Sequence, residues 1–183
     1  MDVCWVGTLR NKARIRSIVP TQQISTDLRE CVDSSILYLK RVIANGKIRL
    51  QSNLPKKAVW ILGDSSQLQL AVTNLLRNAI ETFQENDCRD RKICIQLVAN
   101  RTHAEITVGD SGPGLAPHLR QQIFSVLTSN RPKGTGLGLY LVRTTVVNHG
   151  GEVSVGDSPL GGAEFRVRIP LELPRRITKN GSS

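Results

Sequence analysis

Two asparagines and a glutamate form the first group of side chains that could do chemistry. Asn74, Asn78 and Glu81 are spaced i, i+4 and i+7, so they would share one stripe at the border of a helix's apolar face. Mg²⁺ accepts an asparagine carbonyl when phosphate oxygens and waters complete its shell. The alternative is the edge of a solvated face. Asparagine is a mediocre helix former, so two of them one turn apart in a Leu- and Ala-rich helix call for a further reason.

A carboxylate followed by glycines forms the second group. Asp110 ends an apolar run and precedes Ser-Gly-Pro-Gly, with glycines at 112 and 114. A carboxylate fixed at a strand end can accept a hydrogen bond from the exocyclic amine of adenine, while glycines let the backbone pass close to the ring. An unpaired carboxylate in a dry pocket costs about 1–3 kcal/mol, so this residue would discriminate adenine from guanine. The alternative is an ordinary Asp-initiated turn.

The third group is the glycine-rich run GTGLGL at residues 134–139. Such a segment, leading directly into an amphipathic helix, lets backbone N–H groups approach phosphate oxygens at the helix N-terminus. Alone, the pattern is more often a mobile loop. Here it follows NLLRNAIE at 74–81 and DSGPGL at 110–115, and the ordered set indicates a nucleotide site.

Length and composition favour one globular domain with an aliphatic core. The chain has 183 residues, of which 39% are hydrophobic and only 4% aromatic. No apolar run approaches the roughly 20 residues that cross a bilayer, and no leader peptide is evident, so we expect a cytoplasmic domain that does not span a membrane. The cysteines lack the spacing of a disulfide scaffold and are expected to be reduced and structural. They are Cys4, Cys31, Cys88 and Cys94.

The formal net charge of +10 is concentrated toward both ends of the chain. Because few aromatic residues are available to stack on bases, we do not expect nucleic-acid binding. The positive charge is explained instead by an acidic partner surface or by solvated chain ends. We expect a basic N-terminal segment at 1–20, one folded domain at 21–172 and a disordered basic tail at 173–183.

The elements that must position these groups follow from the spacing of apolar residues. Helical spacing, with Asp64 as an N-cap, predicts long helices and a short helix after Pro117. The long helices are expected at 25–45, 65–84 and 137–148. Strands are expected at 47–51, 58–62, 92–98, 104–108, 152–155 and 163–169, the last four forming two hairpins. Paired strands between helices indicate a mixed sheet with helices on one face.

Together the motifs resemble the ATP-binding catalytic domain of sensor histidine kinases of two-component systems. NLLRNAIE resembles the N box, DSGPGL the first glycine box, Phe124 the F-box phenylalanine and GTGLGLYLVR the second glycine box. HGGEVSV and GGAEFRVRIP resemble the closing strands. The resemblance covers about residues 21–172. It implies an α+β fold that is shared with heat-shock chaperone, mismatch-repair and type II topoisomerase ATPases. This fold is a two-layer α/β sandwich, in which a mixed, mostly antiparallel sheet of about five strands carries three main helices on one face.

The resemblance also implies residue roles. Asn78 resembles the Mg²⁺ ligand, Asn74 a catalytic residue near the phosphates, and Asp110 the aspartate that reads adenine. Residues 125–135 resemble a lid over ATP, from which Lys133 would reach a phosphate as a second catalytic residue, unless it is an ordinary solvated lysine. The other nucleotide-binding residues implied are Glu81, Gly112, Gly114, Leu115, Phe124, Gly134, Thr135, Gly136, Leu137, Gly138 and Leu139. Glu81 departs from the lysine that many members carry.

The function implied by the resemblance is binding of ATP or ADP with Mg²⁺ and donation of the γ-phosphoryl group to a histidine on a separate domain. Hydrolytic relatives carry a water-activating glutamate where this chain has Asn74, so transfer is favoured over hydrolysis. His103, His118 and His149 lack the acidic neighbour of a phosphoacceptor and are expected to be surface or structural residues.

The expected partners follow from the same resemblance. They are a response regulator and the phosphoacceptor hairpin of a parent kinase, which would be the only means of dimerisation. Residues 1–20 resemble the end of that hairpin, and the parent protein is free to be membrane-anchored. Two alternatives stay open: an ATPase or anti-sigma type serine kinase on the same sandwich, and a non-catalytic module in which nucleotide orders a docking surface.

Overall fold

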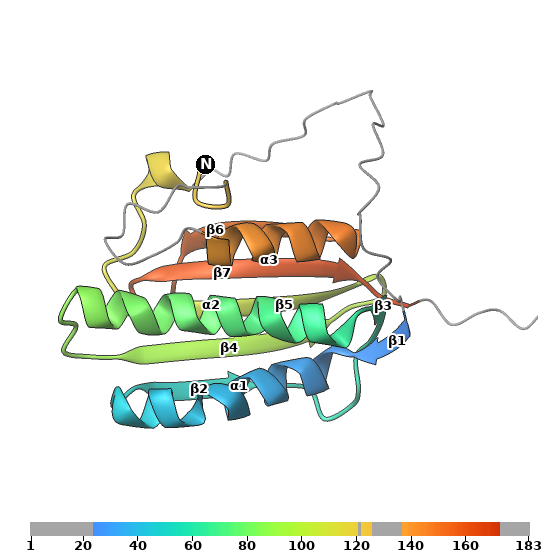
Figure 1. Cartoon of the computed structure of the whole chain (residues 1–183), viewed down its shortest axis with the longest axis horizontal. Helices are drawn as coiled ribbons and strands as arrows, with labels where there is room; N and C mark the ends of the chain where they lie inside the picture. Colours follow the sequence, from blue (N-terminus) through green and yellow to red (C-terminus); the bar gives the residue numbers. More distant parts are fainter. Residues whose placement is uncertain (1–23, 121, 126–136, 173–183) are drawn as a thin grey trace, which may run out of the picture.

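The computed structural model describes residues 24–120, 122–125 and 137–172, and within them the chain forms two layers (Figure 1). One layer is a five-stranded sheet in the spatial order β2 (Arg49–Asn53), β4 (Lys92–Ala99), β5 (His103–Asp110), β7 (Ala163–Pro170) and β6 (Glu152–Asp157). The other layer consists of the helices α1 (Leu28–Asn45), α2 (Ser65–Glu85) and α3 (Leu137–Asn148) on one face of that sheet, with α2 in the middle. The predicted two-layer α+β sandwich is confirmed.

The pairing of the strands also agrees with the prediction of a mixed, mostly antiparallel sheet. Both predicted hairpins form, β4 with β5 and β6 with β7, and β5 and β7 join them through a third antiparallel pair. Only β2 runs parallel to its neighbour, β4. Asp110 is the last residue of the central strand β5 and lies opposite Ile93, which places its carboxylate at one edge of the core.

Alternation along the central strands separates the core from the outer face. In β5, Ile106 and Val108 are buried under the helices, whereas Glu105 faces the other way. On that outer face the guanidinium groups of Arg166 and Arg168 both lie within 4 Å of the Glu105 carboxylate, at 3.7 and 3.6 Å. A face made of such cross-strand ion pairs is suited to water, so helices cover only one side of the sheet.

The central helix α2 packs its apolar stripe against the sheet. Asp64 caps it as predicted, with Oδ1 accepting hydrogen bonds from the backbone N–H groups of Ser66 and Gln67 at 2.9 and 3.1 Å. Nine residues of the helix are buried. They are Leu68, Ala71, Val72, Thr73, Leu75, Leu76, Ala79, Ile80 and Phe83.

A second, two-stranded sheet was not predicted. It pairs β1 (Ile24–Asp27) with β3 (Trp60–Gly63) in antiparallel register. The predicted helix start at residue 25 is therefore wrong, because Asp27 ends β1 and caps α1 through a bond from the Arg29 N–H. The predicted strand at 58–62 exists but pairs outside the main sheet. Four-residue strands such as β1 show too little periodicity to be recognised, and tertiary contacts define them.

The predicted short helix after Pro117 is only partly correct. A single 3₁₀ turn, η1 (Pro117–Leu119), is followed by a turn over residues 122–125. There Phe124 is buried and meets the Phe165 ring edge-on, with centroids 6.1 Å apart. This core contact, rather than helical periodicity, holds the segment. Among the residues that the structure describes, no helix has the length and apolar character needed to span a bilayer.

Candidate nucleotide site

The polar stripe of α2 lies beside the start of α3. Asn74 and Asn78 are both half-buried at the edge of the apolar face. A Cβ atom placed on Gly138, in the first turn of α3, would stand 3.7 Å from Asn74 Oδ1. The fold thus brings Asn74 of the first motif close to Gly138, in the described part of the third motif. Glu81 continues the stripe, with its carboxylate 3.9 Å from Arg77 Nε on the same helix.

Asp110 provides a buried carboxylate at the end of β5, with only 2% of its surface exposed. Its Oδ1 accepts hydrogen bonds from the backbone N–H groups of Gly112, at 2.8 Å, and Ala163, at 3.3 Å. Its backbone carbonyl accepts a third bond from the Gly162 N–H at 3.1 Å. Burial of a charge is costly unless it is hydrogen-bonded, and these donors both offset that cost and fix the direction of the carboxylate.

The loop after Asp110 passes close to α2. A Cβ atom on Gly112 would stand 2.7 Å from Thr82 Cγ2 and 2.9 Å from Asp110 Oδ1, so no side chain fits there. Gly114 has φ of +78°, a conformation that favours glycine. Thr82 is one turn beyond Asn78 and donates its hydroxyl to the Asn78 carbonyl at 2.9 Å. The asparagine stripe and the Asp110 loop therefore meet at Thr82.

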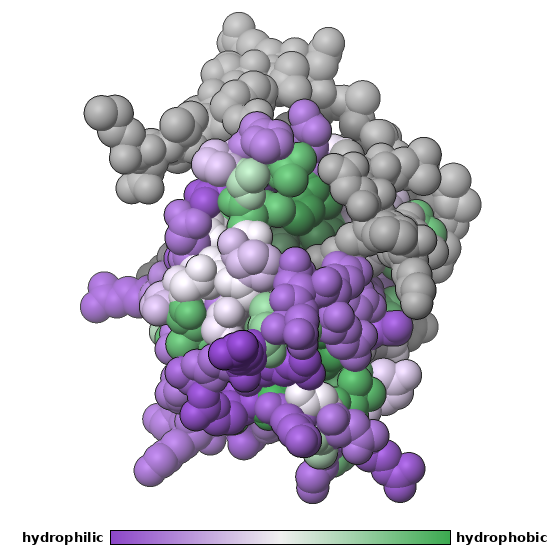
Figure 2. Space-filling model, turned by 90° about the vertical axis from the view of Figure 1, so that its left-hand side faces the viewer, coloured by the Kyte–Doolittle hydropathy of each residue, from purple (hydrophilic) through white to green (hydrophobic). Residues whose placement is uncertain are grey.

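The residues that precede the predicted lid are held by the core and by the hairpin of β6 and β7. Arg120, which follows η1, donates to the Leu115 carbonyl at 3.4 Å and pairs with Asp157 at the end of β6. Leu115 and Leu139 are partly buried against the core. The segment that carries η1 lies at the upper left of Figure 1, and the view of that side in Figure 2 shows a hydrophobic area in the upper half of a mostly hydrophilic surface.

Several predicted residues lie outside the part of the chain that the structure describes. They are Lys133, Gly134, Thr135 and Gly136, together with most of the predicted lid at 125–135. Leu137, Gly138 and Leu139 are described and open α3. The assignment of Phe124 as nucleotide-binding stays a prediction, because its described contacts are with the core.

Sequence reasoning missed Thr82, Ser158 and Gly162. Thr82 could have been found, because it continues the i, i+4 row of Asn74 and Asn78. Ser158 and Gly162 belong to the turn between β6 and β7, and their contacts with the Asp110 loop join residues far apart in the chain. No local pattern reports such contacts.

The histidines have the structural or surface roles expected. His149 is buried, and its Nε2 accepts the Asp64 backbone N–H at 3.0 Å. Nδ1 must then carry the proton and donates to the Thr145 carbonyl at 2.7 Å, which fixes the tautomer. His118 is exposed and His103 bonds its neighbour Thr102.

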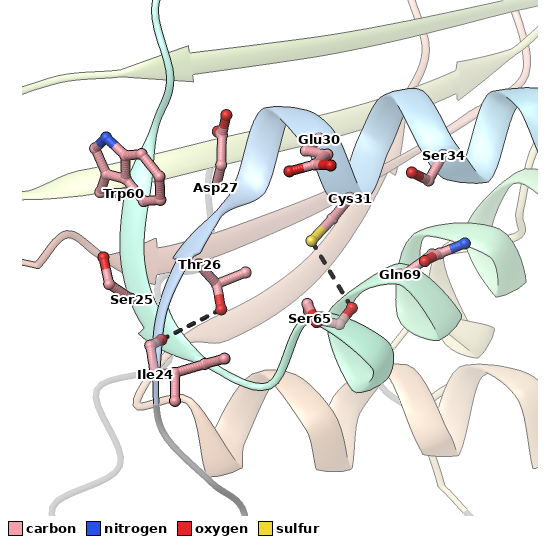
Figure 3. A pocket seen from close by; sticks show the side chains of 10 residues that line it. All are labelled: Ile24, Ser25, Thr26, Asp27, Glu30, Cys31, Ser34, Trp60, Ser65 and Gln69. Atoms are coloured by element: carbon pink, nitrogen blue, oxygen red, sulfur yellow. Dashed lines mark hydrogen bonds between the residues drawn. The ribbon is translucent and has the colours of Figure 1, made fainter.

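The described cysteines, Cys31, Cys88 and Cys94, are free thiols. Burial, reinforced by the nearby Asp27 and Glu30 carboxylates, raises the pKa of the Cys31 thiol to about 11. Cys31 lies with its Sγ atom toward the Ser65 carbonyl and lines a pocket of about 300 Å³ between β1, β3, α1 and α2 (Figure 3). None of the predicted nucleotide-binding residues lines this pocket. Within the described ranges, no group of three His, Cys, Asp or Glu residues is arranged to hold a metal ion.

The sequence is similar to a known protein family and to sensor proteins of bacteria. The sequence profile of the family described as histidine kinase-, DNA gyrase B-, and HSP90-like ATPase matches residues 63–173. The C4-dicarboxylate transport sensor protein DctB of Rhizobium meliloti is 29% identical over 144 residues, covering 79% of this chain and 23% of DctB. The sensor histidine kinase CpxA of Escherichia coli is 34% identical over 128 residues, covering 67% of this chain and 27% of CpxA.

A solved structure shares the fold. The mycobacterial sensor histidine kinase MprB superposes with a TM-score of 0.69 at 28% identity, covering 83% of this chain and 99% of that structure. The chain spans less than a third of the length of the curated relatives named above.

Proposed function

This chain belongs to the histidine kinase-, DNA gyrase B- and HSP90-like ATPase family, and we propose that it binds ATP with Mg²⁺ and donates the γ-phosphoryl group to a histidine on a separate domain. The observation that carries the proposal is the buried Asp110 carboxylate, oriented by two backbone N–H groups and joined through Thr82 and Gly112 to the Asn78 stripe. This arrangement supports a single site in which Asp110 would read the base and Asn78 would offer an oxygen to a cation.

Each described residue has a role in this proposal. Asp110 accepts the exocyclic amine of adenine, and Gly112 and Gly114 let the loop lie against the ring. Asn78 Oδ1 suits Mg²⁺, a hard ion that prefers oxygen ligands, and Asn74 lies toward the phosphates where α3 begins. The N–H groups of the first turn of α3 favour phosphate oxygens. Lys133, Thr135 and their neighbouring glycines are proposed to complete the site.

The amide side chains of the stripe favour transfer over hydrolysis. When bound, Mg²⁺ neutralises charge on the phosphates and helps to align them. Asn74 and Asn78 carry amides, which cannot take a proton from water, so neither can serve as a general base. The chain's own contribution is then to hold the adenine ring, orient the phosphates and keep the γ-phosphoryl group available to an acceptor.

The partners of this activity are proposed from the relatives. DctB and CpxA are sensor proteins of which this chain matches about a quarter, so we propose that the phosphoacceptor and dimerisation hairpin belongs to a parent kinase. A response regulator would receive the phosphoryl group from it. A cytoplasmic location and the absence of nucleic acid among the partners complete the proposal.

A phosphotransfer assay tests it. The full chain is mixed with Mg²⁺, ATP labelled at the γ-phosphate and a separate hairpin fragment carrying the acceptor histidine. The proposal predicts acid-labile label on the fragment, none on its His→Gln variant and none on the chain alone. Steady release of phosphate by the chain alone would instead identify an ATPase, and acid-stable label a serine kinase.

A further inference from the structure

The turn between β6 and β7 forms one wall of the Asp110 loop. We infer that Gly162 and Ser158, in this turn, are positioning residues that set the selectivity of the site for adenine. This inference rests on the proposed function, because it takes Asp110 as the residue that reads the base. Neither residue is proposed to touch the reacting phosphates.

The turn holds Asp110 on the side of β7, where the strand pairing has already ended, while Ile93 of β4 lies opposite it on the other side. The ladder between β5 and β7 ends with Gly109 opposite Glu164. Beyond it, the Gly162 N–H bonds the Asp110 carbonyl at 3.1 Å and the Ala163 N–H bonds Asp110 Oδ1 at 3.3 Å. The turn therefore fixes both the backbone and the carboxylate of Asp110.

Gly162 leaves no room for a side chain. A Cβ atom there would stand 2.1 Å from Asp110 Oδ1, and 2.6 Å from both the Asp110 carbonyl oxygen and the Gly112 nitrogen. Gly162 is not among the described residues with positive φ, so space rather than backbone conformation requires glycine. Any larger residue must move the carboxylate and its loop, because those are the atoms that a Cβ would meet.

Ser158 closes the turn that places Gly162. It is buried, and its N–H donates to the Gly162 carbonyl at 2.9 Å while its own carbonyl accepts the Gly161 N–H at 2.9 Å. Its hydroxyl oxygen accepts the Leu160 N–H at 3.1 Å. That oxygen would stand 2.8 Å from a Cβ on Gly109, so Ser158 also packs directly against the strand that ends at Asp110.

The chemistry of the bases gives these contacts a functional consequence. Adenine offers an amine where guanine offers a carbonyl oxygen, and only the amine can donate to a carboxylate. Discrimination between them depends on the direction of the Asp110 carboxylate. A displaced turn would reduce that discrimination first, while the contacts of α2 and α3 with the phosphates would remain.

The test compares single substitutions in the full chain. Gly162→Ala adds the overlapping Cβ, Ser158→Ala removes the hydroxyl, and Gly156→Ala is the matched control, because a Cβ on Gly156, also in this hairpin, meets nothing within 4 Å. Calorimetry gives the affinities for ADP and GDP with Mg²⁺, and thermal melting gives stability. We expect the ratio of ADP to GDP affinity to fall about tenfold in Gly162→Ala and about threefold in Ser158→Ala, but not in Gly156→Ala.

A second background separates positioning from stability. In Asp110→Asn, the Gly162→Ala change should lower the affinity ratio no further, because it acts through the carboxylate. If Gly162→Ala does not fold, Ser158→Ala carries the same comparison. A lower melting temperature with an unchanged ratio would overturn the inference, whereas a wild-type chain that binds neither nucleotide would overturn the proposed function itself.

Discussion

Asp110 is the one carboxylate that is buried among the described residues. Such a group is expensive to bury, and two backbone N–H bonds to Oδ1 help to offset that cost. A chain that needed only a turn here would be served by an exposed Asp. The buried, oriented carboxylate is the feature on which the proposed adenine contact rests.

Replacing Asp110 by Asn tests that interpretation. The amide keeps the size of the side chain but loses the charge, and we expect ADP affinity to fall by about 10- to 100-fold, equivalent to about 1–3 kcal/mol. Calorimetry with Mg²⁺ measures the change. Asp33→Asn, at an exposed ion pair on α1, is the control and should bind like the wild type. Equal affinities in the two variants would remove Asp110 from the site.

Asn78 is tested through the metal dependence of binding. For the wild type, chelation of Mg²⁺ should weaken ATP binding, because Asn78 is proposed to hold the ion that would neutralise charge on the phosphates. In Asn78→Ala the affinity should already be low, and chelation should change it by less than about twofold. Asn45→Ala, at the exposed end of α1, is the matched control. A full Mg²⁺ effect in Asn78→Ala would show that the ion is held elsewhere.

Cys31 predicts a dependence of stability on pH. Its pKa in the folded chain, about 11, lies above the ordinary value of 9.0, so its contribution is complete below pH 9 and is lost as pH rises toward 11. The free energy of unfolding of the wild type should therefore fall relative to that of Cys31→Ala between pH 9 and 11. Urea unfolding at a series of pH values measures the difference. A constant difference would contradict the burial of a protonated thiol.

At the scale of elements, His149 joins the end of α3 to the start of α2. It bonds the Asp64 backbone and fills the space beside Gly63, where a Cβ would stand 2.5 Å from the imidazole Cδ2. Asp64 in turn caps α2. One imidazole thus sets the relative position of the two helices that border the site.

Removal of this imidazole should cost stability. His149→Ala leaves the Asp64 N–H without its partner and opens a cavity, and we expect the free energy of unfolding to fall by about 2–4 kcal/mol. His118→Ala, at an exposed position, is the control and should change it by less than about 0.5 kcal/mol. Urea denaturation measures both. An equal effect of the two substitutions would show that the bonds of His149 contribute nothing.

The long elements were predictable because their own residues carry the signal. Nine buried positions of α2 repeat at helical spacing, and α3 ends where predicted, at Asn148. The strand β1 and the turn around Phe124 were not predictable, because a distant partner defines each of them: β3 for β1 and Phe165 for Phe124. Length and periodicity thus decided which elements could be read from the sequence.

At the scale of the whole molecule, the candidate site is assembled from four segments that are distant in the sequence: α2, the end of β5, the start of α3 and the turn after β6. The residues with distinctive chemistry, Asn74, Asn78 and Asp110, could be identified from their types and order. Gly162 could not, since the bond between Ala163 and Asp110 spans 53 residues and small residues in a turn are common. The outer face of the sheet carries cross-strand ion pairs, whereas the residues of the candidate site lie on the side of the helices and at the ends of the strands.

Measuring the binding of nucleotide to the full chain is the most direct test of the central proposal, which is that this fold holds ATP through Asp110 and Asn78. Calorimetry with ADP and Mg²⁺ should give a saturable signal with a Kd below about 1 mM, at least about tenfold tighter than for GDP. The absence of saturable heat with ADP or ATP at millimolar concentration, from a chain shown to be folded, would contradict it.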